Sequence, residues 1–246
     1  MKEYLKREAP LFVTASCMTL MSLLVLEVFM CFGMFSKNKG LVATIIQMFL
    51  FTAMIAFVIL LVSSGKAMMR HLRDENYYRV NKAAGDSSAM TFIKLTALYS
   101  VILFIIGGLY ILLLGLDIMW STGVFPEEKK GISDIWNTMF PGPNSGAVIA
   151  TTVLELLTIA FLFTTLVFFC VTIAYNLFTK SRYAGILAAL FFAMLGYFLV
   201  KLNLQLLGSF DTLTYHLASA GFCIVVTAIL FVVTLASLKK HNWKSE

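Results

Sequence analysis

Six long apolar runs, separated by short polar segments, dominate this chain of 246 residues. Each run is about 22 to 30 residues long, and a helix needs roughly 20 apolar residues to cross the hydrocarbon core of a bilayer. Unpaired backbone groups are costly in lipid, so such runs predict helices. The sequence therefore predicts an all-α membrane protein with one transmembrane domain over residues 1–246. Its six expected spans cover residues 11–35, 41–62, 95–116, 147–175, 183–207 and 213–238.

The charged residues predict how the chain crosses the membrane. Only 13% of the residues are charged, against about 25% in soluble domains. The net charge of +6 does not indicate a nucleic-acid partner, because Lys and Arg gather at the ends of the apolar runs. Positive residues concentrate in cytoplasmic segments. With the N-terminus inside, 14 of the 19 Lys and Arg residues lie on the inner side. We therefore expect two cytoplasmic termini and a multi-pass protein of the bacterial plasma membrane.

The two longest expected loops have different patterns. The inner loop, 63–94, is basic, and its part from 66 to 80 is rich in good helix formers. The outer loop, 117–146, has apolar residues at helical spacing, which predict a short helix lying on the membrane surface. These residues are Ile132, Ile135, Trp136, Met139 and Phe140. Such a helix could be a lid over a substrate path or a simple interfacial anchor.

Three ionisable residues fall within the expected spans: Glu27, Glu155 and Lys201. Charged groups in a bilayer normally face protein or water. By their positions, all three lie in the outer half of the membrane, which predicts a polar cluster with Lys201 facing a carboxylate. The cluster could line a substrate path or be a buried ion pair that sets helix register. Thr151, Thr158 and Thr165 share a helical face with Glu155.

Other polar and small residues receive simpler interpretations. Asp211 and His216 are expected at a solvated loop end beside the sixth span. Gly185, Ala189 and Ala193 are four residues apart, a spacing that favours close helix packing.

Motifs for catalysis and for nucleotide or metal binding do not occur. There is no HExxH and no Gly-x-Ser-x-Gly. Gly65-Lys66 lacks both the upstream glycine and the following Ser or Thr of a phosphate-binding loop. The four cysteines have no metal-ligand spacing. We therefore expect no catalytic residues, cofactor or metal in this chain.

The inner loop has a recognisable order of features. Arg73-Asp74-Glu75-Asn76-Tyr77-Tyr78-Arg79 is an acidic and aromatic stretch, residues 83–88 form a turn in which Ser87 or Ser88 can cap the next helix, and Lys94 opens the third span. This order resembles the ABC-2 family of ABC transporter permeases, most closely over residues 60–114. Those subunits have six spans, both ends inside and a coupling helix between spans 2 and 3.

The resemblance implies a transport subunit rather than an enzyme. Its expected partners are a cytoplasmic ATP-binding subunit, a second copy or a sister permease, and membrane lipid. The residues expected to contact the ATPase are Arg73, Asp74, Glu75, Tyr77 and Tyr78. Ala84-Gly85 replaces the family's Leu-Pro, and 208–212 is too short for the family's re-entrant segment. These departures favour an exporter of a peptide, lipid or hydrophobic drug over a polymer channel.

Two other functions are compatible with the same pattern. An ion-coupled secondary transporter would use titration of Glu27, Glu155 and Lys201. A membrane anchor or immunity factor would need none of these residues to move a substrate.

Overall fold

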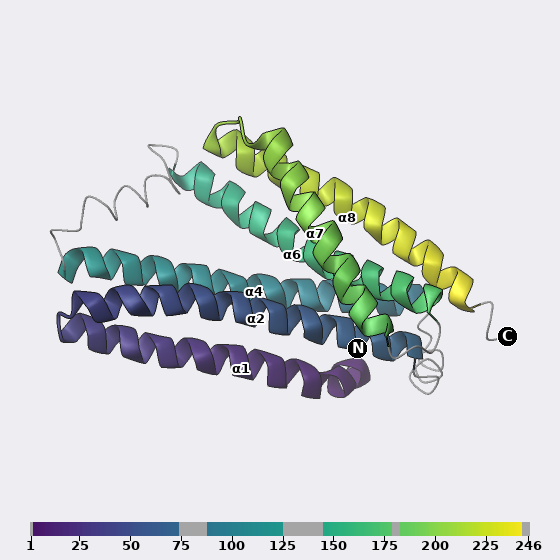
Figure 1. Cartoon of the computed structure of the whole chain (residues 1–246), viewed down its shortest axis with the longest axis horizontal. Helices are drawn as coiled ribbons and strands as arrows, with labels where there is room; N and C mark the ends of the chain where they lie inside the picture. The colour runs from purple at the N-terminus through teal and green to yellow at the C-terminus, as the bar shows by residue number, and fades with distance from the viewer. Residues whose placement is uncertain (1, 74–87, 125–144, 179–182, 243–246) are drawn as a thin grey trace. The chain divides into compact units, whose positions relative to one another are not determined.

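The computed structural model describes residues 2–73, 88–124, 145–178 and 183–242. Within these ranges the chain forms six helices and no strand (Figure 1). Each helix contains a stretch long and apolar enough to cross a membrane. The predicted number of spans and the multi-pass architecture are therefore confirmed for the described chain. The helices are α1 (Lys2–Phe35), α2 (Lys39–Arg73), α4 (Ser88–Val124), α6 (Ser145–Leu177), α7 (Ala184–Leu207) and α8 (Thr212–Asn242).

Helices α2 and α4 extend well beyond the apolar runs from which they were predicted. The expected inner loop began at residue 63, but α2 continues to Arg73, and α4 already begins at Ser88. The expected outer loop began at residue 117, but α4 continues to Val124. The end of an apolar run is therefore not the end of a helix, and the good helix formers that begin at residue 66 continue α2 to Arg73. In α2 the extension stays packed, with Ala67 and Met68 completely buried. The proposed surface helix at 132–140 lies outside the described residues.

Contacts divide the described chain into two compact units. The first unit comprises Met1–Leu60 and Leu103–Ile149. It holds α1, the first part of α2 and the last part of α4. The second unit comprises Leu61–Ile102 and Ala150–Glu246. It holds the remaining parts of α2 and α4, nearly all of α6, and the whole of α7 and α8.

The first unit is built on a one-sided stripe of buried residues in α1. They recur every three or four positions, at Ala15, Thr19, Leu23, Leu26, Met30 and Met34. This spacing puts one face of a helix against its neighbours. In Figure 1, α1 runs alongside α2. The Tyr110 hydroxyl of α4 donates a hydrogen bond to the Thr19 carbonyl oxygen at 3.2 Å, which ties α4 to α1.

A tight turn over residues 36–38 joins α1 to α2. Lys37 takes a left-handed backbone conformation, with φ at 51°. The Asn38 N–H then donates to the Gly33 carbonyl oxygen at 3.1 Å, so the last turn of α1 is closed. The Asn38 side-chain oxygen accepts from the Leu41 N–H at 3.1 Å, as in a helix N-cap. The three polar residues 36–38 therefore reverse the direction of the chain between α1 and α2.

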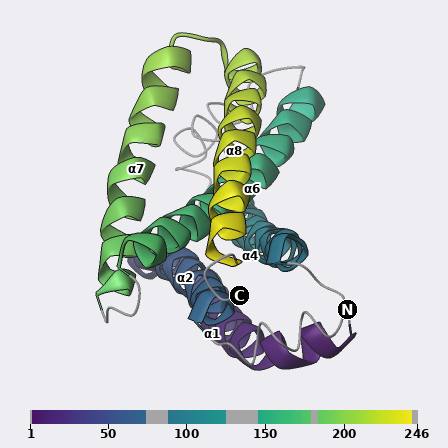
Figure 2. The ribbon, with the colours of Figure 1, turned by 90° about the vertical axis from the view of Figure 1, so that its right-hand side faces the viewer.

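Helix α6 is the most buried spanning helix of the described chain. In the most apolar part of its span 61% of residues are buried, compared with 6% in α7 and 17% in α8. Phe168 of α6 is fully buried, and its ring lies 5.9 Å from that of Phe92 in α4. The ring of Phe92 also packs against that of Phe231 in α8, with 4.8 Å between the ring centroids. Figure 2 shows α7 and α8 as a helical hairpin, in which a short turn connects the end of α7 to the start of α8.

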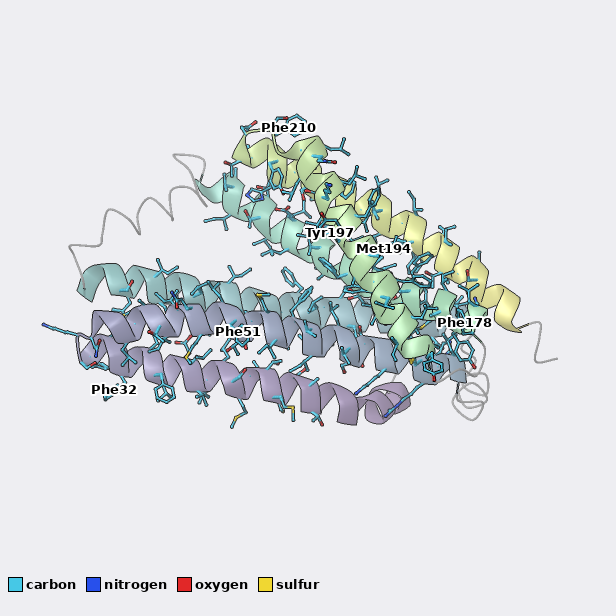
Figure 3. All side chains as sticks on the ribbon, in the orientation of Figure 1. Phe32, Phe51, Phe178, Met194, Tyr197 and Phe210 are labelled. Carbon is cyan, nitrogen blue, oxygen red and sulfur yellow. The ribbon has the colours of Figure 1, made fainter. Side chains whose placement is uncertain are left out.

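Helix α7 contributes only small residues to the interior. Its buried residues are Ala184, Ala188 and Gly196. Of the stripe predicted from spacing, Gly185 does pack closely, because a methyl group added there would come within 3.1 Å of the Met69 side chain of α2. Ala189 and Ala193 are exposed, so that part of the prediction was wrong. The large side chains of α7 lie on the opposite face, where Met194 and Tyr197 are 63% and 70% exposed (Figure 3).

Candidate functional site

The candidate site lies in the second unit and begins with the polar side of α6. Glu155 and Thr158 are both buried there, each with 8% exposure. The Thr158 hydroxyl donates to the Glu155 backbone carbonyl oxygen at 2.8 Å, so it is satisfied by its own helix. Thr151, one turn before Glu155, is partly exposed. Thr165 is fully buried, and its hydroxyl has no hydrogen-bond partner among the described residues.

Glu155 is paired with His216 near the start of α8. The Nδ1 atom of His216 is hydrogen-bonded to the Oε2 atom of Glu155. Both side chains are mostly buried, with 17% of His216 and 10% of Glu155 exposed. The expectation that His216 is a solvated loop end was therefore wrong. The hairpin between α7 and α8 places His216 against α6, which its position near a loop did not reveal.

Three neutral polar residues continue the site from α7 to α8. Asn203 of α7 donates through Nδ2 to the Ser219 hydroxyl oxygen at 3.0 Å. The Tyr215 hydroxyl donates to the Asn203 side-chain oxygen at 3.2 Å. Sequence reasoning missed these residues, although an asparagine four positions from the end of an apolar span was a usable signal.

A cavity of about 160 Å³ lies among α6, α7 and α8. Its polar lining comes from Glu155, Asn203, Tyr215 and Ser219, together with the Cys223 thiol. The rest is apolar and includes Phe163, Leu166, Gly196 and Phe222. Sites for small molecules commonly combine an apolar wall with a few placed polar groups. This cavity has that composition, with one carboxyl group among the lining side chains.

The other predicted site residues have different surroundings. Lys201 is exposed on α7, and the described residues include no ion pair between it and Glu155, whose partner is His216. The expected facing of Lys201 and Glu155 is therefore corrected. Glu27 lies in the first unit, whereas Glu155 lies in the second, so their grouping stays a prediction.

The predicted docking residues lie where α2 ends. Arg73 is the last residue of α2, while Asp74, Glu75, Tyr77 and Tyr78 lie outside the described residues. Among described positions, no group of three or more His, Cys, Asp or Glu residues is arranged to hold a metal ion. No protein-family model, curated protein or solved structure matches this chain.

Proposed function

We propose that this chain is the membrane-spanning permease subunit of an ATP-driven ABC exporter. A separate cytoplasmic ATPase would dock on the segment between α2 and α4. Six helices of spanning length support a permease architecture, and the resemblance to ABC-2 permeases in residues 60–114 supports the mode of coupling. The charge bias of the loops supports two cytoplasmic termini in a bacterial plasma membrane.

The lengths of α2 and α4 are suited to docking. At about 1.5 Å per residue, these helices of 35 and 37 residues are each more than 50 Å long. The hydrocarbon core is only about 30 Å thick. Both helices therefore extend beyond it, and the extension of α2 ends directly before Asp74. This geometry would place the acidic and aromatic stretch away from the lipid, where a soluble partner could reach it.

The observation that carries the proposal is that these helix extensions are packed within the second unit. A methyl group added at Gly65 of α2 would come within 3.3 Å of the Val167 side chain of α6. Phe92, near the start of α4, is fully buried against Phe168 of α6. A force applied to residues 74–87 would therefore reach α6, which carries Glu155 and lines the cavity. Packed helices transmit such displacements because interiors leave little free space.

The same unit supports a class of substrate. The mostly apolar cavity favours a small hydrophobic or amphipathic substrate over a polymer. A second permease copy or a sister permease is the membrane partner that the family resemblance implies. The surface helix at 132–140 would lie on the outer side.

The test is to look for a soluble ATPase gene beside the gene of this chain and to co-purify the two products. We expect a stable complex that hydrolyses ATP and is weakened by Tyr77→Ala and Tyr78→Ala, because large aromatic side chains often dominate protein interfaces. Exposed Tyr197→Ala on α7 is the matched control and should leave the complex intact. Failure to form a complex with any ATPase would overturn the proposal.

A second candidate function is an ion-coupled carrier. The Glu155–His216 pair favours it, because intramembrane carboxylate and imidazole groups are typical of proton relays. Transport by such a carrier would collapse with the ion gradient and survive ATP depletion. An ABC permease would show the opposite pattern, and an anchor protein would transport nothing under either condition.

A further inference from the structure

The cavity among α6, α7 and α8 is polar at one end and apolar at the other. Asn203 of α7 and Tyr215 of α8 lie close to the 208–211 turn that joins these two helices, and Glu155 of α6 is held beside them by its hydrogen bond to His216. Leu166 and Gly196 lie near the middle of α6 and α7. A ligand that matches this lining has a polar head and an apolar body.

Part of the cavity wall is also outer surface of the unit. Val200 and Leu204 of α7 line the cavity, yet they are 50% and 55% exposed. In a bilayer this surface of α7 would face lipid, so a molecule dissolved in the membrane could enter between these side chains. An amphipathic ligand meets both conditions, because it partitions into lipid and still offers a polar head.

The charge of the polar head is set by Glu155. A carboxylate can accept about four hydrogen bonds, so its bond to His216 leaves acceptor capacity for a donor in the cavity. The other groups around it are Tyr215 and Cys223 of α8 and Asn203 of α7, all ordinarily neutral near pH 7. The matching head is therefore a cation.

From this geometry we infer that the cavity binds a small amphipathic cation, of about the size of one aromatic ring bearing an ammonium group, with its head held by the Glu155 carboxyl group. An apolar cavity of about 150 Å³ accommodates benzene, and this one has about 160 Å³. Aromatic rings of Phe163, Tyr215 and Phe222 in the lining also suit a cation. As a substrate site this inference rests on the proposed transport function; as a binding site it does not.

Calorimetry on the purified full chain, without any ATPase, tests the site. The probe is benzylammonium at pH 7, and benzyl alcohol is its neutral counterpart of nearly the same size. We expect benzylammonium to bind at least about tenfold more tightly, because a charge-assisted hydrogen bond is stronger than a neutral one.

Two variants and a control separate the site from general effects on folding. Glu155→Gln should abolish the preference for the cation over benzyl alcohol. Val200→Trp, at a half-exposed position of the lining, fills the cavity while leaving both members of the pair in the sequence, and it should block binding of both probes. Met194→Trp, at an exposed α7 position outside the cavity lining, should bind like the unaltered chain.

Equal binding of the two probes, or undiminished binding by Val200→Trp, would overturn the inference. Because the ATPase is absent, these results are independent of the docking test. A stable ATPase complex without cation binding would remove this site and leave the permease proposal intact. Cation binding without any ATPase complex would support the site and favour the ion-coupled carrier.

Discussion

The two units differ in whether the buried carboxyl groups of their helices have hydrogen-bond partners. In the second unit, Glu155 is hydrogen-bonded to His216 beside a cavity. In the first unit, the Oε1 atom of Glu27 and the Oδ2 atom of Asp117 are buried without a hydrogen-bond partner among the described residues. An unsatisfied polar group in an apolar interior costs free energy. The presence of a carboxyl group within an apolar span therefore does not reveal whether that group has a hydrogen-bond partner.

Breaking the Glu155–His216 pair should have the largest effect. His216→Leu is expected to lower the free energy of unfolding by about 3 kcal/mol, because the Glu155 carboxyl group stays buried without its partner. Adding Glu155→Leu should recover part of this loss, because both polar groups are then gone. Unfolding in mixed micelles measures both variants against Glu155→Leu alone. Additive effects of the two substitutions would show that the pair is not energetically coupled.

The two carboxyl groups of the first unit that have an unsatisfied buried oxygen should respond in the opposite direction. Glu27→Gln and Asp117→Asn are expected to raise the free energy of unfolding by up to about 1 kcal/mol, because each removes a charge that is costly in a membrane interior. The same unfolding assay measures them. A loss of about 2 kcal/mol or more would mean that these groups have a stabilising partner, and the contrast between the units would disappear.

A smaller effect is expected at Lys201, an ionisable residue of the second unit that is exposed and not part of the Glu155–His216 pair. Lys201→Met should change the free energy of unfolding by less than about 0.5 kcal/mol, since the residue is exposed on α7 and its long chain can reach toward the membrane surface. Cation binding and transport should also stay unchanged. A large loss of stability, cation binding or transport would show that Lys201 does belong to the polar cluster predicted from the sequence.

The smallest effect is expected at Asp211, outside the spans. Hydrogen bonds from the Thr214 side chain and backbone hold the pKa of this carboxyl group below its ordinary value. Because the pKa is lowered on folding, Asp211 stabilises the fold fully above the ordinary carboxyl pKa of about 3.9. That contribution is lost as the pH falls through the lowered pKa.

Asp211→Asn should abolish this pH dependence while keeping the side-chain oxygen that caps α8. Comparing unfolding of the two proteins between about pH 5 and pH 2 measures the difference. Identical pH profiles of the two proteins would show that the negative charge of Asp211 does not stabilise the fold through its hydrogen bonds from Thr214.

The limits of prediction from sequence are visible in α7. Two stripes of small residues run along this helix one position apart, and both have the spacing that favours close packing. The packed stripe contains Ala184, Ala188 and Gly196, whereas Ala189 and Ala193 are exposed. Spacing gives the periodicity of a helix face, but the rotation of the helix depends on its neighbours. His216 shows the same limit, because its partner is 61 positions away in the chain.

The sequence by itself determined the helical class and the six spans of the described chain, because apolar length and backbone hydrogen bonding are local requirements. It also indicated that Glu155 would face protein rather than lipid. Only the tertiary structure decided that its partner is His216, that Lys201 stays exposed, and that Asn203, Tyr215 and Ser219 line the cavity. Those outcomes depend on how α6, α7 and α8 are rotated and brought together, which is a property of the packed unit and not of any single span.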